Sequence, residues 1–278
     1  MLFEIVLAIL IGIIAGIITG LIPGIHINLI GALLISISGS YFLRNTNNLY
    51  LIIFISSMAI THTFIDFIPS IYLGCPDTDT ELAILPGHEL LKKGQGHKAV
   101  LESNYGSISA IFILIVISIP SIWIISNFFK YIEFLIPYLL IIISLFLIMS
   151  EKKKIKSLFI FILTGILGFF VFNLNMEQNL FPLLTGLFGS SMLIISMKNK
   201  TIIPKQEIIY EKFPFEKIKK PLIGSIIGAP LCSFLPGLGS GQAAIIGKTF
   251  IKMSREQFLT LIGSINTLVM GFSFISLY

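Results

Sequence analysis

The sequence has 278 residues, of which 55% are hydrophobic and only 12% are charged, and its mean hydropathy is +0.95. This composition excludes a soluble globular domain and predicts an all-α polytopic membrane protein. The formal net charge of +5 at pH 7 would suggest nucleic acid as a partner, but the basic residues lie in short segments between apolar runs, which excludes it.

Apolar segments follow one another along the chain and predict membrane helices. They cover residues 2–22, 27–43, 49–73, 105–126, 131–149, 157–173, 180–197, 222–235, 242–251 and 257–278. A helix needs about 20 apolar residues to cross ~30 Å of hydrocarbon. The segment 222–235 reaches only about 21 Å and the one after it is shorter, so together they predict a hairpin that enters the membrane and returns.

Two Pro-Gly pairs interrupt apolar segments, one within residues 22–28 and the other within residues 235–242. Proline removes a backbone donor and glycine permits positive φ, so each pair ends one half-helix and starts another. Irregular backbone inside a membrane is tolerated only where it is buried in protein or lines a cavity. Both tips are therefore candidate substrate sites, with the residues Pro23, Gly24, His26, Asn28, Pro236, Gly237, Gly239, Ser240, Gly241 and Gln242.

The half-helices that begin near Ile27 and Gly241 give these tips a chemical preference. The N-terminus of a helix carries unpaired N–H donors and about half a positive charge, which suits a carboxylate or phosphate. The alternative is that the glycines only permit tight helix packing, as small residues often do in membranes.

The distribution of basic residues predicts the topology. If each hairpin returns the chain to its starting side, all Lys and Arg residues except Arg44 and Lys130 fall on one side, in residues 74–104, 151–156, 198–221 and 248–256. The positive-inside rule makes that side cytoplasmic and the N-terminus external. The N-terminus lacks a positive n-region and a cleavage site, which predicts a retained membrane segment.

The two hairpins then enter from opposite sides and predict inverted repeats, each opening with a Pro-Gly-broken, re-entrant helical hairpin. The first repeat is residues 1–197 with its hairpin at 2–43, the basic cytoplasmic linker is 198–221, and the second repeat starts at 222–278. The second repeat stops after its first full helix, so the chain is either a fragment or needs a partner. Inverted repeats with broken helices are typical of secondary transporters.

Polar residues recur in the long helix that follows each hairpin. His62 and Asp66 are four residues apart and therefore share one face of a membrane helix. Ionisable groups inside a membrane are costly, so they are functional candidates by default. We predict ion or proton coupling by Ser57, Thr61, His62, Asp66 and Asn266; the alternative is a structural hydrogen bond.

The loop 74–104 carries acidic residues, Asp77, Asp79 and Glu81, and two histidines, His88 and His97. The acids predict helix capping on the cytoplasmic surface, with a cation or gating site as the alternative. The histidines are expected to be solvated, and Gly94 is expected to stop a helix. Cys75 and Cys232 are too far apart in sequence to predict a disulfide framework or a metal site.

The segment Pro86 to Ala99, with Lys92-Lys93-Gly94-Gln95 inside it, and the two Pro-Gly breaks resemble the TctA family, the large permease subunit of tripartite tricarboxylate transporters. More specifically, they are similar to its shorter archaeal relatives, over nearly the whole chain. The resemblance implies a multi-pass permease of the cell membrane, without enzymatic activity or a cofactor beyond Na⁺ or H⁺ coupling. It also implies a small membrane subunit and an extracytoplasmic binding protein as partners, beside the lipid bilayer; a homo-oligomer is a further expectation.

The leading functional hypothesis is a permease that moves a small organic anion, a carboxylate, by alternating access with cation coupling. A second hypothesis is translocation of a polyprenyl-phosphate lipid, which a groove open to lipid would favour. A third is an intramembrane hydrolase using His26, His62 and Asp66, but the sequence lacks a His-Glu-x-x-His pair and a second well-placed membrane aspartate.

The topology can be tested by cysteine labelling of intact cells in a background where Cys75 and Cys232 are serine. We expect Lys153→Cys and Lys212→Cys to be protected from a membrane-impermeant reagent, because both are cytoplasmic. Asn47→Cys and Asn175→Cys should be labelled. Labelling at position 212 but not at 175 would reverse the orientation.

Overall fold

The structure, a computed structural model, describes residues 2–22, 30–31, 34, 48–74, 79–174, 194, 203–208, 213, 215–235 and 238–275. Every regular element within these ranges is a helix, and six helical segments are long and apolar enough to cross a membrane. The prediction of an all-α polytopic membrane protein is thereby confirmed. The chain forms two compact units, Met1–Phe129 with Ile203–Tyr278, and Lys130–Ile202. This division follows internal contacts and leaves the predicted repeat boundaries untested.

In the first unit, α1 (Leu2–Leu21) packs along α3 (Asn48–Ile65) through glycines at every fourth position, Gly12, Gly16 and Gly20. A Cβ on Gly16 would lie 2.5 Å from the Met58 carbonyl oxygen and 2.6 Å from the Thr61 Cβ. Small residues let two helix backbones approach closely in a membrane. The contact therefore depends on the absence of side chains along this stripe.

α3 is followed after Asp66 by α4 (Phe67–Leu73), and the cause of the break is Pro69. Proline has no N–H, so the Ile65 carbonyl four residues earlier loses its helical donor. The neighbouring backbone hydrogen bonds persist, from Asp66 N to His62 O at 3.0 Å and from Ser70 N to Asp66 O at 3.3 Å. Asp66 thus lies at a weakened turn of an almost continuous membrane helix.

The predicted second hairpin is present as α10 (Phe215–Phe234) and α11 (Ser240–Phe250), which pack against each other. A Cβ on Gly228 would lie 2.5 Å from the Ala243 carbonyl oxygen, and one on Gly247 would lie 2.6 Å from that of Gly224. With 11 residues, α11 is only about 16 Å long and is too short to cross a membrane.

α10 begins at Phe215, seven residues before the predicted arm at 222, and continues through Pro221. Proline at 221 cannot donate to the carbonyl of Lys217. The Gln257 side-chain amide takes that place, with Nε2 donating to the Lys217 oxygen at 3.1 Å. A contact 40 residues away in sequence therefore lets the helix start inside the predicted linker.

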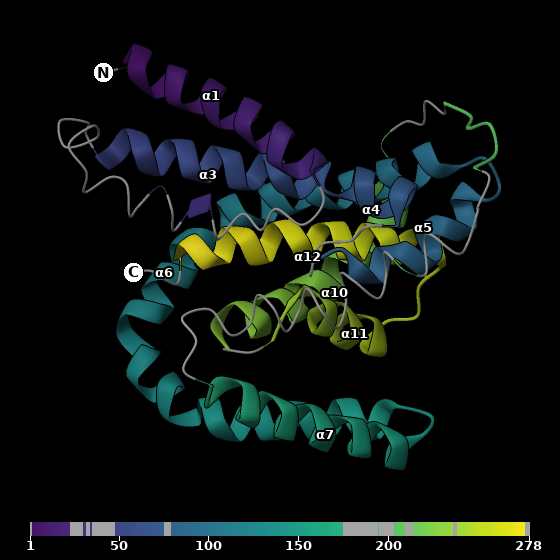
Figure 1. Ribbon diagram of the computed structural model, residues 1–278. Coiled ribbons are helices and arrows are strands. Elements are labelled where there is room, and N and C mark those ends of the chain that lie inside the picture. The colour runs from purple at the N-terminus through teal and green to yellow at the C-terminus, as the bar shows by residue number, and fades with distance from the viewer. Residues whose placement is uncertain are drawn as a thin grey trace. The chain divides into compact units, whose positions relative to one another are not determined.

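α12 (Arg255–Ile275) lies at the centre of this unit, between α3 and the α10–α11 hairpin (Figure 1). Its span is 72% buried, against 33% or less for the other candidate spans. Met58 clusters with Met270, Thr63 with Thr267 and Asp66 with Asn266, so residue numbers rise along α3 as they fall along α12. The two helices are antiparallel, as the helices that follow two inverted hairpins would be.

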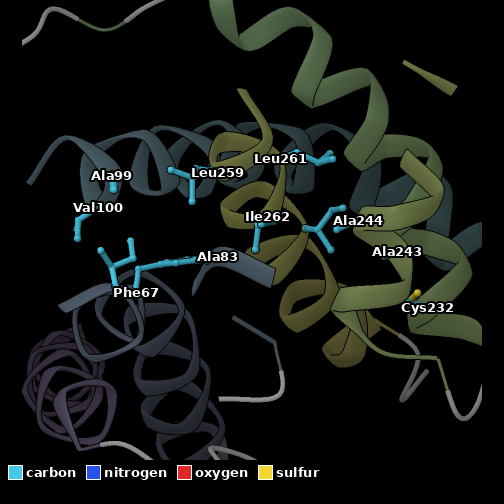
Figure 2. Packing of buried hydrophobic residues seen from close by; sticks show 12 residues of the cluster. Phe67, Ala83, Ala99, Val100, Cys232, Ala243, Ala244, Leu259, Leu261 and Ile262 are labelled. Atoms are coloured by element: carbon cyan, nitrogen blue, oxygen red, sulfur yellow. The ribbon is translucent and has the colours of Figure 1, made fainter. Parts of the chain in front are cut away.

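Apolar residues on the same helices form the core beside these polar contacts. Figure 2 shows Leu259, Leu261 and Ile262 of α12 among small and aromatic side chains of the neighbouring elements. The others labelled there are Phe67, Ala83, Ala99, Val100, Cys232, Ala243 and Ala244. This cluster ties α4, α10, α11 and the start of α6 to α12.

The predicted cytoplasmic loop contains helices η1 (Glu81–Ala83) and α5 (Ile84–Leu91) and a turn in which Gly94 adopts φ +78°, as expected for a helix stop. The extended segment 203–208 lies on this turn. Gln206 Oε1 accepts from Gly96 N at 2.7 Å, and Gln206 Nε2 donates to the Leu91 oxygen at 3.0 Å. The turn that contains Lys92-Lys93-Gly94-Gln95 is therefore held in place by hydrogen bonds to the basic linker 198–221.

α6 (Gly96–Ser150) differs from the sequence prediction at both ends of its first span. It begins inside the predicted loop 74–104, and it continues through Lys130, where two separate spans were expected. Residues 127–130 contain neither glycine nor proline, and Asn127 Nδ2 donates back to the Trp123 carbonyl oxygen at 2.7 Å. Nothing local therefore stops the helix, although its two apolar spans, Gly96–Phe128 and Glu133–Ser150, remain distinct.

The second unit contains the end of α6, a basic turn at 151–153 and α7 (Lys154–Phe172). None of the residues of α7 is buried. No described atom lies within 4 Å of a Cβ built on Gly165 or Gly168.

Replacement of a packed glycine should be far more harmful than replacement of an open one. Gly16→Ala should lower the free energy of unfolding by about 1–3 kcal/mol, because the new Cβ meets backbone that cannot move away easily. Gly165→Ala is the matched control, and it should be neutral or stabilise by about 0.5–1 kcal/mol through helix propensity. Chemical denaturation in detergent measures both. Equal effects would show that α1 does not pack on α3 through Gly16.

Candidate functional site

The described part of the second tip is the beginning of α11. Gly239 precedes the helix with φ −110° and ψ 178°, an extended conformation that any residue can adopt. The positive φ that a glycine would permit is therefore not used at this position. Its N–H donates to Gln242 Oε1 at 3.0 Å. Gln242 thus closes the first turn of α11. Of the other predicted tip residues, Pro23, Gly24, His26, Asn28, Pro236 and Gly237 lie outside the described residues.

Two carboxylates of the loop 74–104 meet this helix N-terminus. Ser240 Oγ donates to Asp79 Oδ1 at 2.7 Å, and a Cβ on Gly241 would lie 2.8 Å from Glu81 Oε1. Ser240 is buried. The positive end of a helix stabilises negative charge, so this placement is electrostatically favourable. The second tip and the acidic loop, for which helix capping was predicted with a cation or gating site as the alternative, therefore lie together.

The charge at this site depends on pH through Glu81. Desolvation by the surrounding protein, and then the negative charge of Asp79, raise the pKa of the Glu81 carboxyl above its ordinary value. Glu81 therefore takes up a proton at a higher pH than a solvated glutamate does. Because its folded pKa is raised, its ionisation opposes folding as pH rises through that range.

Buried hydroxyls connect the loop segment from Asp79 to Glu81 with the break between α3 and α4 at Asp66. Ser70 Oγ lies 2.6 Å from Thr80 Oγ1 and donates to the Asp66 carbonyl oxygen at 2.7 Å. Ser70 and Thr80 are both fully buried. A displacement of the loop at Asp79 and Glu81 would therefore act on the weakened turn.

At that turn, two predicted coupling residues from opposite ends of the chain come together. Asn266 Nδ2 of α12 donates to Asp66 Oδ2 at 2.8 Å, and the neighbouring hydroxyls of Thr63 and Thr267 lie 3.0 Å apart. Asp66 is 5% exposed and Asn266 2%. This is a buried, hydrogen-bonded carboxylate inside a candidate membrane span.

The remaining predicted coupling residues face α1. His62 Nδ1 lies 3.1 Å from Thr19 Oγ1, and His62 is buried. Ser57 and Thr61 lie against the glycine stripe, since Cβ atoms on Gly12 and Gly16 would approach their Cβ atoms to 2.8 and 2.6 Å. The structure therefore places these three residues beside α1.

A second buried carboxylate, Glu102 on α6, was missed by sequence reasoning, which placed it in the loop 74–104. Glu102 is 2% exposed, and its Oε2 accepts from Thr260 Oγ1 of α12 at 3.1 Å. The two helix backbones approach closely there, because a Cβ on Gly106 would clash with the Thr260 carbonyl oxygen. The small residues Ser103, Gly106 and Ser107 follow Glu102 closely in the sequence. This spacing was the signal that Glu102 belongs to a packed helix and not to a loop.

The expectation that His88 is solvated is wrong. Its Nε2 is buried and has no hydrogen-bond partner among the described residues, and its ring fills the space beside Gly74, where a Cβ would lie 2.8 Å from Cε1. Desolvation, followed by the charge of Lys92, lowers the pKa of His88, and a hydrogen bond with the Ile71 backbone partly offsets this. α4 and α5 pack together at this point, which shields Nε2 of the half-buried ring from water.

Among the described residues, no group of three or more His, Cys, Asp or Glu side chains could hold a metal ion. The hydrolase hypothesis needed His26, which lies outside those residues.

Comparisons with known proteins place the chain among transporters. A family model described as the tripartite tricarboxylate transporter TctA family matches residues 6–278. An uncharacterized protein of Methanocaldococcus jannaschii is 34% identical over 219 residues, which cover 76% of this chain and 54% of the relative. The chain thus spans about half the length of the curated relative it matches. No solved structure matches it.

The hydrogen bond between Ser240 and Asp79 can be measured by a double-mutant cycle. Ser240→Ala should lower the free energy of unfolding by about 1.5 kcal/mol, and Asp79→Asn should add little once the hydroxyl is gone. Ser118→Ala is the control, because that exposed hydroxyl donates only to Ile115 O of its own helix, and it should change stability by less than about 0.5 kcal/mol. Additive effects of the two tip substitutions would show that the loop does not hold the tip.

Proposed function

Because the chain belongs to the tripartite tricarboxylate transporter TctA family, we propose that it is a permease that moves a small organic anion, a carboxylate, across the membrane by alternating access. The family is one of transporters, and the candidate spans make the chain a multi-pass membrane protein. The observation that carries the proposal is the position of the Asp79 and Glu81 carboxylates at the N-terminus of α11.

The position of these two side chains supports a carboxylate as the ligand of the tip. The Ser240 hydroxyl and the first N–H groups of α11 are donors at the positive end of a helix, and the chain's own carboxylates lie there. A substrate carboxylate can use the same donors only if Asp79 leaves, because three negative groups so close together repel one another. Binding of substrate would therefore expel the acidic loop from the tip.

Expulsion of the acidic loop would link substrate binding to the binding of a coupling cation. Thr80 would lose its contact with Ser70, which holds the backbone at Asp66. A buried carboxylate in a membrane is costly when charged, and a Na⁺ ion or a proton would neutralise it. We propose the Asp66–Asn266 pair as that cation site. The ligand and the cation then favour the same conformation, which is the requirement for coupled transport.

The family name also suggests the partners. A tripartite transporter has a small membrane subunit and an extracytoplasmic binding protein, and we propose both for this chain.

Binding can be tested by a thermal-shift screen of the detergent-purified protein against di- and tricarboxylates and inorganic phosphate, with and without Na⁺ and at two pH values. A ligand that binds only the folded state raises the apparent stability. We expect a carboxylate to stabilise the wild type, and a cation to strengthen that effect. Asp66→Asn should keep the carboxylate shift and lose its cation dependence.

Two substitutions at the tip make the test specific. Gly241→Val should weaken carboxylate binding at least tenfold, since loss of about 1.4 kcal/mol suffices for that, whereas Gly168→Val on the open surface of α7 should leave it unchanged. Asp79→Asn should strengthen binding severalfold, because the competing negative charge is gone. A folded Gly241→Val protein with native affinity would exclude the tip as the substrate site.

A further inference from the structure

An apolar cavity of about 580 Å³ opens between α6 and the beginning of α10, and none of its lining residues belongs to the tip. Its volume is in the range of pockets that hold organic ligands. α6 contributes Phe112, Ile113 and Val116, and α10 contributes Leu222 and Ile226. All these residues belong to the first compact unit.

The cavity faces the hydrocarbon of the membrane. Its α6 wall belongs to the candidate span Gly96–Phe128, and Phe112 and Val116 are 66% and 74% exposed. Side chains of this kind on a spanning helix contact lipid tails. Water in such a cavity would find too few polar partners to be stable. A hydrocarbon chain is therefore the occupant that fits the wall.

The mouth of the cavity has a different chemistry. Phe213 and Phe215 lie there with ring centroids 4.9 Å apart, and Tyr105 packs edge-on against Phe213 at 5.3 Å. Aromatic side chains gather at the level of lipid headgroups. Lys219 also lines the mouth, and Lys220 follows it.

The charge at the mouth is positive. The exposed Glu216 carboxylate lies 2.8 Å from Lys219 Nζ, and Glu256 Oε2 lies 4.0 Å from Lys217 Nζ. Residues 215–220 contain three lysines and one glutamate, so this turn and a half of helix keeps an excess of positive charge. Basic residues beside a membrane attract anionic lipids, and the long lysine stems can lie along apolar surface while their amines reach the phosphate.

We propose that this cavity binds an anionic phospholipid, with an acyl chain between α6 and α10 and its phosphate at Lys219 and Lys220. Lys219 is the one cationic side chain among the described residues that line the cavity, so the headgroup stays beside it and the lipid is a bound component of the bundle. This site is separate from the proposed substrate tip. Because the lipid contacts the first arm of the second hairpin, its binding should stabilise that arm.

The proposal is tested with purified, delipidated full-length protein. Phosphatidylglycerol, phosphatidylcholine, a polyprenyl phosphate and inorganic phosphate are added separately, and native mass spectrometry counts bound lipid while a thermal-shift assay measures stability. We expect phosphatidylglycerol to bind and stabilise, and the other three to bind at least fivefold more weakly. The double variant Lys219→Gln, Lys220→Gln should lose that preference. Lys154→Gln with Lys156→Gln on α7 is the matched control.

A second pair of variants tests the cavity itself. Ile113→Trp, which fills it, should reduce phosphatidylglycerol binding at least fivefold, whereas Ile162→Trp on the exposed surface of α7 should not. If Ile113→Trp does not fold, Ile226→Phe replaces it. Equal binding of phosphatidylcholine, tighter binding of the polyprenyl phosphate, self-association that blocks lipid binding, or no retained lipid would each overturn the proposal.

Discussion

The organisation of the first compact unit follows from the polar side chains of α12. A helix inside a membrane cannot leave a polar group facing hydrocarbon without a cost of several kcal/mol. α12 meets this constraint with partners on three helices: Thr260 pairs with Glu102 of α6, Ser264 with Ser225 of α10, and Asn266 and Thr267 with Asp66 and Thr63 of α3. A shift of any of these helices by one residue would break such a pair. Polar contacts therefore determine the register of these helices, because their apolar residues alone would allow several registers.

Those hydrogen bonds form only because glycines allow the backbones to come close. Ser107 reaches the Gly263 carbonyl oxygen at 3.1 Å, and a side chain on Gly263 would clash with the backbone of Ser103. The same relation joins the two arms of the second hairpin at Gly228 and Ala243. Small residues and buried polar residues are thus two parts of one packing scheme, and either one without the other would leave a gap or an unpaired group.

The sequence predicted what depends on local chemistry. The end of α10 at Phe234, the short arm α11 and the stop at Gly94 follow from residues within a few positions of each feature. Errors arose where a distant contact changes the local outcome. Gln257 donates a hydrogen bond to the Lys217 carbonyl oxygen, which Pro221 cannot do, so α10 starts earlier in the sequence than predicted. No short-range sequence pattern contains that information. The meeting of Ser240 with Asp79 joins positions 161 residues apart. The loop and the tip could therefore be nominated separately but not recognised as one site.

The same geometry gives a physical reason for linking an anion to a cation in this fold. Asp66 is held by the Asn266 amide, a neutral donor that offsets only part of the cost of a buried charge. At the tip, desolvation, and then the negative charge of Asp79, already raise the pKa of Glu81. In the proposed mechanism, an incoming carboxylate adds to that charge, and expulsion of the acidic loop would relieve it by moving Asp79 and Glu81 away from the tip. The loop then no longer supports the turn at Asp66 through Thr80 and Ser70, which would open the buried carboxylate to a cation. In the proposed mechanism, charge balance would make anion binding and cation binding favour each other without direct contact between the two ions.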